Sequence, residues 1–364
     1  MTPKSTIPAL TSIRGIAAWW VVFYHFREYV PFFGLPFLRE IAAAGYLAVD
    51  LFFVLSGFVI FLNYGKWFST TEHGNFVKFI SARIARVYPL HVVVLLAFLI
   101  NPIALLFSSH PEQLGKLYDP FYFFLSLLMI QNWGFADHLG WNIPAWSIST
   151  EWFAYLSFPI MAYLLGRYAS RTIHTLFILV TTLLILAALF YWQGATDIGS
   201  DIPYLGLPRC FGEFVAGICI CQLSYRYAED KRGVMLSLAT ILLCLMLCTR
   251  LPSYTWAPVL FCALIFGLSA TTGILEKMLT ARWLLFLGGI SYSTYMIHYL
   301  LKHWVKFLLV KTDGPQGTAT LVYLSAVLLG SVLLHRFVEL PGRKLISSRY
   351  RTKAIAVAST QPSS

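Results

Sequence analysis

The stretch "TIHTLFILVTTLLILAALFYW", Thr172–Trp192, decides the fold, because it contains no Asp, Glu, Lys or Arg. A helix needs about 20 predominantly apolar residues to cross the hydrocarbon core of a bilayer. Two other segments, Val234–Cys248 and Thr318–Leu334, also lack acidic and basic residues. These runs predict transmembrane helices, and the fold class is therefore an all-α, polytopic membrane helix bundle.

Composition supports a membrane protein and argues against a soluble one. The chain has 364 residues, of which 58% are hydrophobic and 12% charged, more apolar residues than one soluble core could bury. The net charge of +11 would suggest nucleic acid if it lay on a soluble face. The cations instead gather between apolar segments, and loops such as "QGATDIGSDIP" are acidic or neutral, which is the pattern of membrane topology. We expect membrane lipids as partners and no nucleic acid.

Placing the basic loops in the cytoplasm predicts about ten transmembrane helices with both termini cytoplasmic. The expected spans are 13–30, 44–63, 87–108, 146–165, 172–192, 204–223, 234–250, 254–272, 284–303 and 318–337. Residues 120–131, "PFYFFLSLLMIQ", are short for a span and predict a partial or re-entrant helix on the outer side. One transmembrane domain would cover 1–346, and 347–364 would form a disordered basic cytoplasmic tail.

Three lysines contradict this topology. Lys302, Lys306 and Lys311 follow the ninth expected span and would lie outside the cytoplasm, against the usual bias of basic residues.

The six cysteines predict packing and no metal site. All lie within expected spans, without metal-binding spacing or a CxxC pair. The first apolar run is too long and too aromatic for a cleavable signal peptide, so we expect it to stay in the protein.

The first span carries an arginine and a histidine within "IRGIAAWWVVFYHF". Arg14 and His25 are eleven positions apart, so both lie on one helix face, about 16 Å apart along the axis at 1.5 Å per residue. An ionisable side chain in hydrocarbon is costly, so each is a functional candidate. A ligand whose anionic group binds Arg14 could extend a chain inward as far as His25. The alternative is an arginine that snorkels to lipid phosphates and a packing histidine.

"SARIARVYPLH" places Arg83 and Arg86 on one helix face shortly before Pro89. Paired guanidiniums suit phosphate binding, although arginines beside a span are also ordinary topology signals.

"IPAWSISTEWFAYLSFP" buries Glu151 in a span, with Ser147 and Tyr155 one helical turn to either side. A buried carboxylate needs a partner or a proton. It could hydrogen-bond an imidazole, carry protons, or form a purely structural bond between helices.

Further polar groups in the spans have simpler expected roles. Asp50 is expected to pair with an arginine, and Arg209 and Glu213, four residues apart, are expected to neutralise each other. Ser291, Tyr295 and His298 share one side of the ninth span, where a hydrogen-bonded network and a substrate contact are both possible. Glu339 is expected to be an anchor or an ion-pair partner at the end of the last span.

These stretches, taken in order over nearly the whole chain, resemble the integral-membrane acyltransferase-3 family, which includes bacterial O-antigen, exopolysaccharide and Nod-factor O-acylases. The resemblance rests on "IRGIAAWWVVFYHF", "GYLAVDLFFVLSGFVI", "RIARVYPLH", "WSISTEWFAYLSFP", "GGISYSTYMIHYLL" and "VELPGRK". The chain is similar to the stand-alone form, without a periplasmic hydrolase-like domain. It departs from the family pattern in "ALTSIR", where Ile13 replaces a leucine and an acidic residue is missing.

The resemblance implies a membrane O-acyltransferase in a bacterial cytoplasmic (inner) membrane. It would move an acyl group, most simply acetyl from acetyl-CoA, to a hydroxyl of a carbohydrate or lipid-linked glycan acceptor. We expect the donor as a substrate and no permanently bound cofactor. Arg14, Arg83 and Arg86 would bind the donor phosphates. His25 would act as general base or take the acyl group itself, and Glu151 would orient His25.

A secondary transporter is the main alternative, with Asp50, Glu151, His25 and His298 forming a proton or substrate path. Inverted repeats would favour a transporter, and none is evident. A membrane scaffold has no reason to bury this many ionisable groups.

Overall fold

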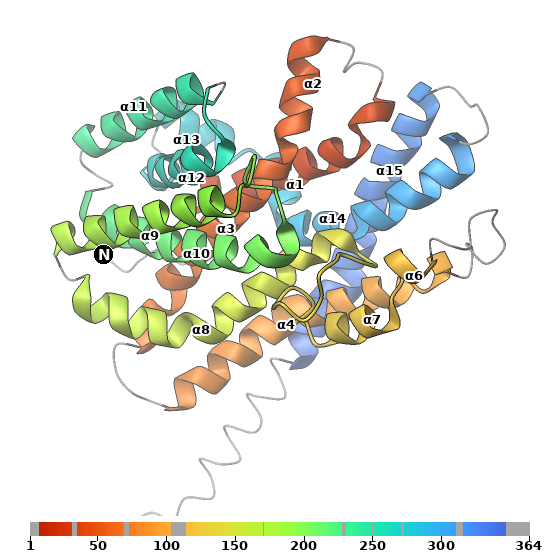
Figure 1. The fold of residues 1–364 in the computed structure, drawn as a ribbon, viewed down its shortest axis with the longest axis horizontal. Coiled ribbons are helices and arrows are strands. Elements are labelled where there is room, and N and C mark those ends of the chain that lie inside the picture. Colours follow the sequence, from red (N-terminus) through yellow and green to blue (C-terminus); the bar gives the residue numbers. More distant parts are fainter. Residues whose placement is uncertain are drawn as a thin grey trace, which may run out of the picture.

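The fold is a bundle of helices with no strand in the described part of the chain (Figure 1). The computed structural model describes residues 7–30, 35–68, 73–102, 114–169, 171–227, 231–248, 250–270, 273–310 and 316–346. The helices are α1 (Pro8–Phe26), α2 (Pro36–Ala43), α3 (Ala48–Tyr64), α4 (His73–Ala97), α6 (Leu114–Leu117), α7 (Pro120–Leu127), α8 (Trp146–Tyr168), α9 (Thr172–Trp192), α10 (Ile202–Tyr227), α11 (Lys231–Leu247), α12 (Ser253–Ser269), α13 (Gly273–Leu279), α14 (Arg282–Val305) and α15 (Gln316–Leu334). The expected tail, 347–364, lies outside the described residues.

The all-α membrane bundle predicted from the sequence is confirmed, whereas the count of ten spans is not. Among the described residues, six helices are long and apolar enough to cross a membrane, or seven if the bent pair α12 and α13 forms one span. Helices α1 and α8 are not among the six, because serines, tyrosines and ionisable residues interrupt their apolar runs. Helix α7 has eight residues, which agrees with a partial helix too short to span.

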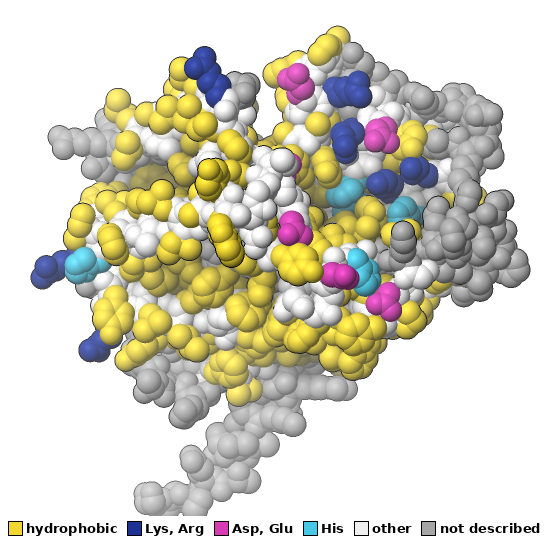
Figure 2. All heavy atoms as spheres, viewed as in Figure 1, with side chains coloured by type: hydrophobic (Ala, Val, Ile, Leu, Met, Phe, Trp, Pro, Cys, Tyr) yellow, Lys and Arg dark blue, Asp and Glu magenta, His cyan; other side chains and the backbone are white. Residues whose placement is uncertain are grey.

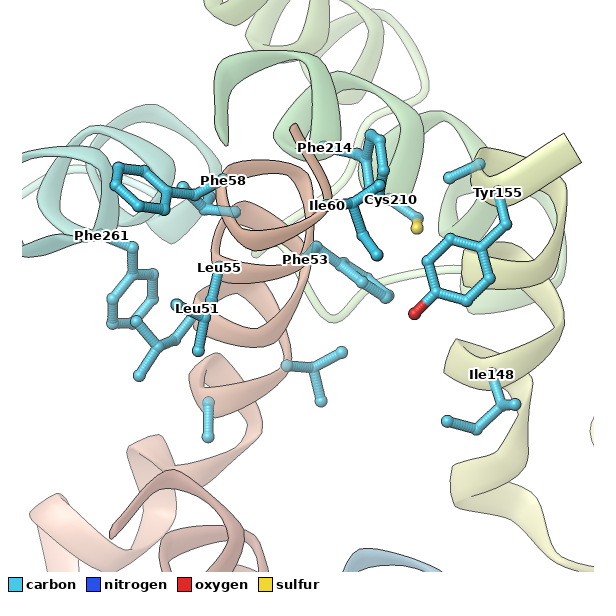
Figure 3. Close-up of a cluster of buried hydrophobic side chains, with 14 of the residues drawn as sticks. Leu51, Phe53, Leu55, Phe58, Ile60, Ile148, Tyr155, Cys210, Phe214 and Phe261 are labelled. Carbon is cyan, nitrogen blue, oxygen red and sulfur yellow. The ribbon is translucent and has the colours of Figure 1, made fainter. Parts of the chain in front are cut away.

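Helices α3 and α10 cross closely at the centre of the bundle. Glycines make this crossing possible: a Cβ at Gly57 would collide with the backbone of Phe214, and one at Gly217 with the backbone of Val54. Figure 3 shows the apolar side chains of α3 pointing on one side toward Phe261 of α12 and on another toward α8. Helix α3 is therefore a largely buried central helix, and α8, α10 and α12 pack against it.

Helices α1 and α14 form the second close pair, and they run parallel. A Cβ at Gly15 would lie 2.6 Å from the backbone nitrogen of Gly288, and ten residues later along both helices His25 meets His298. Parallel packing matters for the site, because residues the same number of positions beyond Gly15 in α1 and beyond Gly288 in α14 lie beside each other, as His25 and His298 do. The N-terminal ends of both helices lie at one end of the bundle, and His25 and His298 lie toward the other.

Candidate active site

A cavity of about 150 Å³ lies near the N-terminal half of α1, and we call it the arginine cavity. Helices α1, α3, α4, α8 and α14 all contribute to its walls. Its polar lining residues are Arg14, Ser56, Arg83, Arg86, Ser147, Glu151, Tyr155, Ser291, Tyr292 and Tyr295. The structure thus gathers all three arginines expected to bind phosphate, together with Glu151, around one space.

Two of the three arginines keep donor capacity for a ligand. Arg14 donates from Nη2 to the carbonyl of Gly288 at 2.9 Å, and Arg83 donates from Nη2 to the Tyr64 hydroxyl at 2.8 Å. The buried Nε atoms of Arg14 and Arg83 have no partner among the described residues. Arg86 instead forms an ion pair with Glu339, which fulfils the expected anchoring role of that carboxylate. The cavity can therefore hold an anion through Arg14 and Arg83.

Glu151 is held within the arginine cavity. Its carboxylate accepts hydrogen bonds from the Tyr155 hydroxyl, at 2.6 Å, and from the Ser56 hydroxyl. No hydrogen bond joins it to His25 among the described residues, so the contact that we expected from the sequence is not observed. Ser291 lies in the same cavity and donates to the carbonyl of Gly288 at 2.8 Å.

His25 contacts a second histidine. The Nδ1 atom of His298 lies 2.6 Å from the Tyr295 carbonyl, which can only accept, so this nitrogen carries hydrogen. In the neutral ring, His298 Nε2 is then an acceptor, and it lies 3.2 Å from His25 Nδ1. His25 Nδ1 is also 3.0 Å from the Val21 carbonyl. Both neighbours of His25 Nδ1 are acceptors, so Nδ1 carries the hydrogen and the lone pair is on Nε2.

His25 lines a larger cavity of about 400 Å³, which we call the histidine cavity. Its polar and aromatic lining residues are Tyr24, His25, Arg27, Tyr46, Trp146, Asp197, Arg209 and Tyr295. His25 is half-buried, while His298 behind it is fully buried. His25 is therefore accessible from this cavity, whereas His298 is not.

Tyr295 and Val49 line both cavities and so form the wall between them. The Tyr295 hydroxyl donates to the Pro144 carbonyl at 2.9 Å and lies 2.8 Å from the Ser147 hydroxyl. Its carbonyl is the group that orients His298. The side chain of Tyr295 thus bounds the arginine cavity, and its backbone sets the histidine pair.

Asp50 and Arg209 form a buried, bidentate ion pair. Arg209 Nε and Nη2 lie 2.6 and 2.7 Å from the two Asp50 carboxylate oxygens. The expected pair of Arg209 with Glu213 is wrong, because two guanidinium nitrogens of Arg209 are hydrogen-bonded to Asp50 of α3 instead. Both Glu213 oxygens are buried without a hydrogen-bond partner in the described part of the chain.

Metal ligation has no structural support within the described ranges. They contain no group of three His, Cys, Asp or Glu side chains placed to hold a metal ion. The six cysteines are free thiols, and all but Cys248 are buried.

Several lining residues were not found from the sequence. Ser56 was not predicted as a site residue, yet its hydroxyl donates a hydrogen bond to Glu151. Tyr46 and Asp197 also line the histidine cavity. Tyr46 lies in the quoted stretch "GYLAVDLFFVLSGFVI" but was not predicted as a site residue, and an acidic residue in the loop 193–203 was a weak signal for Asp197.

Fold and site together define a multi-pass membrane protein with one cavity lined by arginines and a second cavity lined by a histidine that a neighbouring histidine orients. The chain belongs to the acyltransferase family described as "Acyltransferase domain", whose family model matches residues 7–336. The family assignment agrees with the resemblance found in the sequence and makes the protein a membrane acyltransferase.

Relatives with curated names support the same class. The chain is 26% identical to "Acyltransferase MdmB" of Streptomyces mycarofaciens, over 94% of this chain and 93% of that protein. It is 23% identical to "O-acetyltransferase OatA" of Staphylococcus aureus, over 93% of this chain but only 57% of that longer protein. A shorter match, 40% identical over 33% of this chain, is "Protein 2 in picA locus" of Rhizobium radiobacter. No solved structure matches the chain.

Proposed function

We propose that the protein transfers an acetyl group from acetyl-CoA to a hydroxyl of a carbohydrate or lipid-linked glycan in the bacterial inner membrane. Arg14 and Arg83 would bind the donor phosphates in the arginine cavity, with Arg86 held beside them by Glu339. The pantetheine arm would pass the wall formed by Tyr295 and Val49. The acceptor would enter through the histidine cavity.

The observation that carries this proposal is that helix α1 places an arginine at one cavity and a histidine at the other. Arg14 lines one cavity and His25 the other, about 16 Å apart at a rise of 1.5 Å per residue. An extended pantetheine arm can span this separation and bring the thioester to the imidazole. A transporter needs no such pairing of an anion-binding cavity with an oriented base.

The chemical step follows from the histidine tautomers. His25 Nε2 removes the proton from the acceptor hydroxyl while the oxygen attacks the thioester carbonyl. A new C–O bond forms, the C–S bond breaks, and the thiolate of CoA takes the proton from the His25 imidazolium. His298 Nε2 accepts the His25 Nδ1 hydrogen throughout and keeps the ring in place.

Incorporation of label from radiolabelled acetyl-CoA into membranes of cells that express the chain tests this function. We expect label in an extractable glycan or lipid fraction that is absent from membranes without the protein. Purified protein should also bind CoA thioesters. If neither label nor CoA binding is found, the acetyl-CoA-dependent function is wrong and the transporter returns as the better interpretation.

Arg14→Ala should raise the KM for acetyl-CoA about 10- to 100-fold, because it removes a charge-assisted hydrogen bond of about 1.5–3 kcal/mol. The comparison of acetyl-CoA with acetyl-pantetheine isolates the phosphate contact: wild type should prefer acetyl-CoA and Arg14→Ala should prefer it less. Arg282→Ala removes an exposed arginine of α14 and is the matched control. An unchanged preference in Arg14→Ala would remove its assigned role.

A further inference from the structure

Three cations gather at the end of the bundle opposite the arginine cavity, and we call them the outer cations. Arg27 follows α1, and Lys302 and Lys306 lie at the end of α14. Because α1 and α14 run parallel, all three lie at the same end, beyond His25 and His298. Figure 2 shows Lys, Arg and His side chains gathering on the face in view, between α2 and α15, with Asp and Glu side chains among them. Lys302 and Lys306 are two of the three lysines that contradict the predicted topology, and Lys311 lies outside the described residues. The proposed chemistry has given Lys302 and Lys306 no role so far.

Two of the outer cations, Arg27 and Lys302, lie over aromatic rings that contact His25. The Tyr24 ring contacts His25 with centroids 4.9 Å apart, and Arg27 Cζ lies 4.5 Å from the Tyr24 centroid. On the other side, the Tyr299 ring lies 5.3 Å from His25, and Lys302 Nζ lies 5.0 Å from the Tyr299 centroid. Each ring that packs edge-on against His25 therefore holds a cation within the range of a cation–π contact.

Carboxylates do not neutralise this group. No ion pair involves Arg27, Lys302 or Lys306 among the described residues. The exposed carboxylate of Glu28 attracts Lys302, whereas Lys306 and Arg27 repel Lys302. Asp197, across the histidine cavity, already accepts from its own loop at Gly199. In the described structure, neither Glu28 nor Asp197 is hydrogen-bonded to any of the three half-buried outer cations.

The chemical step places a further positive charge close to the outer cations. When His25 takes the proton of the acceptor, an imidazolium forms within the field of Lys302 and Arg27, both of which disfavour it. His298 is neutral in the hydrogen-bonded pair and supplies no negative charge. A negative charge brought in by the acceptor would offset the imidazolium and occupy the outer cations in the same step.

We propose that the acceptor is an anion, with a phosphate or carboxylate held by Arg27, Lys302 and Lys306 while its neighbouring hydroxyl meets His25 Nε2. This inference rests on the proposed acetyl transfer and specifies its acceptor. The same cations could bind the phosphate of a membrane lipid headgroup, so the experiment must separate an anionic acceptor from an anionic lipid.

The test compares wild type with the double variant Lys302→Gln and Lys306→Gln. The matched control is Lys277→Gln with Arg282→Gln, which removes one exposed cation of α13 and one at the opposite end of α14. The labelled product from the membrane assay is extracted and passed over an anion-exchange column. We expect the wild-type product to bind the column through a charge that is not removed with the acetyl group.

The kinetic arm uses purified enzyme in phosphatidylcholine vesicles, with the extracted acceptor fraction and labelled acetyl-CoA. The lysine double variant should lose about tenfold in kcat/KM for the acceptor, with the KM for acetyl-CoA unchanged, and the control should match wild type. Raising the salt from 0.01 to 0.3 M should slow wild type and control more than the lysine variant, since salt screens exposed charges. Addition of phosphatidylglycerol should not restore the variant.

Three results would overturn the proposal: a neutral labelled product, an acceptor kcat/KM that the lysine variant leaves unchanged, or activity that requires phosphatidylglycerol, which would assign the outer cations to a lipid headgroup. Absence of label from wild type, together with absence of CoA binding, would instead reject the proposed acetyl transfer and this inference with it.

Discussion

His25→Ala lowers acetyl transfer by about 10²- to 10⁴-fold, the usual contribution of a positioned general base. The expected loss is large because His25 Nε2 is the only lone pair that the histidine pair presents, since His298 is fully buried and both of its nitrogens have partners. The measurement is kcat for label transfer from acetyl-CoA at saturating donor. Affinity for CoA should stay near that of wild type, because the donor phosphates would bind about 16 Å away along α1.

The control for His25→Ala is His174→Ala, which removes an exposed histidine of α9 and should leave activity unchanged. His298→Ala should give an intermediate loss in kcat with an unchanged KM for acetyl-CoA. In this variant His25 keeps the lone pair on Nε2 but loses the hydrogen-bond acceptor that holds its ring in place. Retention of more than a tenth of the activity in His25→Ala would make His25 a packing residue. Equal losses in CoA affinity and in kcat would point to misfolding instead.

Arg209→Met destabilises the protein by about 3–5 kcal/mol, because breaking a buried ion pair leaves an uncompensated charge. Asp50 would lose both of its guanidinium donors and remain buried beside Glu213, with which it already interacts electrostatically. Asp50→Asn should cost clearly less, because Glu213 is close enough to attract Arg209 and has both oxygens free of hydrogen-bond partners in the described structure. Removing Arg209 is thus predicted to destabilise the protein more than removing the charge of Asp50, although the two residues form one ion pair.

Thermal unfolding of the purified variants in detergent, followed by intrinsic fluorescence, measures this asymmetry. Arg250→Met, which removes an exposed arginine, is the control and should unfold with wild type. Glu213→Gln alone should be close to neutral, but combined with Asp50→Asn it should approach the loss seen in Arg209→Met. Equal destabilisation by Asp50→Asn and Arg209→Met would show that Glu213 does not act as a reserve partner.

Part of the site could be predicted because it lies on single helices. The spacing of Arg14 and His25 along α1 follows from helix geometry alone, and the structure places them at two cavities on that helix. The cost of ionisable groups in hydrocarbon also pointed to residues that meet in space, since Arg83, Arg86 and Glu151 all line the arginine cavity. Within one helix, the sequence already contains the relative position of two side chains.

Contacts between helices could not be predicted in the same way. Glu151 was expected to reach His25, but α8 places it against Ser56 of α3, and the partner of His25 comes from α14. Arg209 was expected to pair within its own helix and instead pairs with Asp50 of α3. A carboxylate or a histidine has several possible partners of suitable chemistry, and only the packing of the helices selects one.

The sequence by itself determined the membrane-embedded helical class, the family, and which ionisable residues had to be functional or paired. It could do so because hydrocarbon penalises each unpaired charge, whichever helices are neighbours. The tertiary structure decided which residues meet. Glycines bring α1 against α14 and α3 against α10, and these close crossings set the register that pairs His25 with His298 and separates the two cavities at Tyr295. Register between helices depends on side-chain shapes along two surfaces at once, which one-dimensional spacing does not contain.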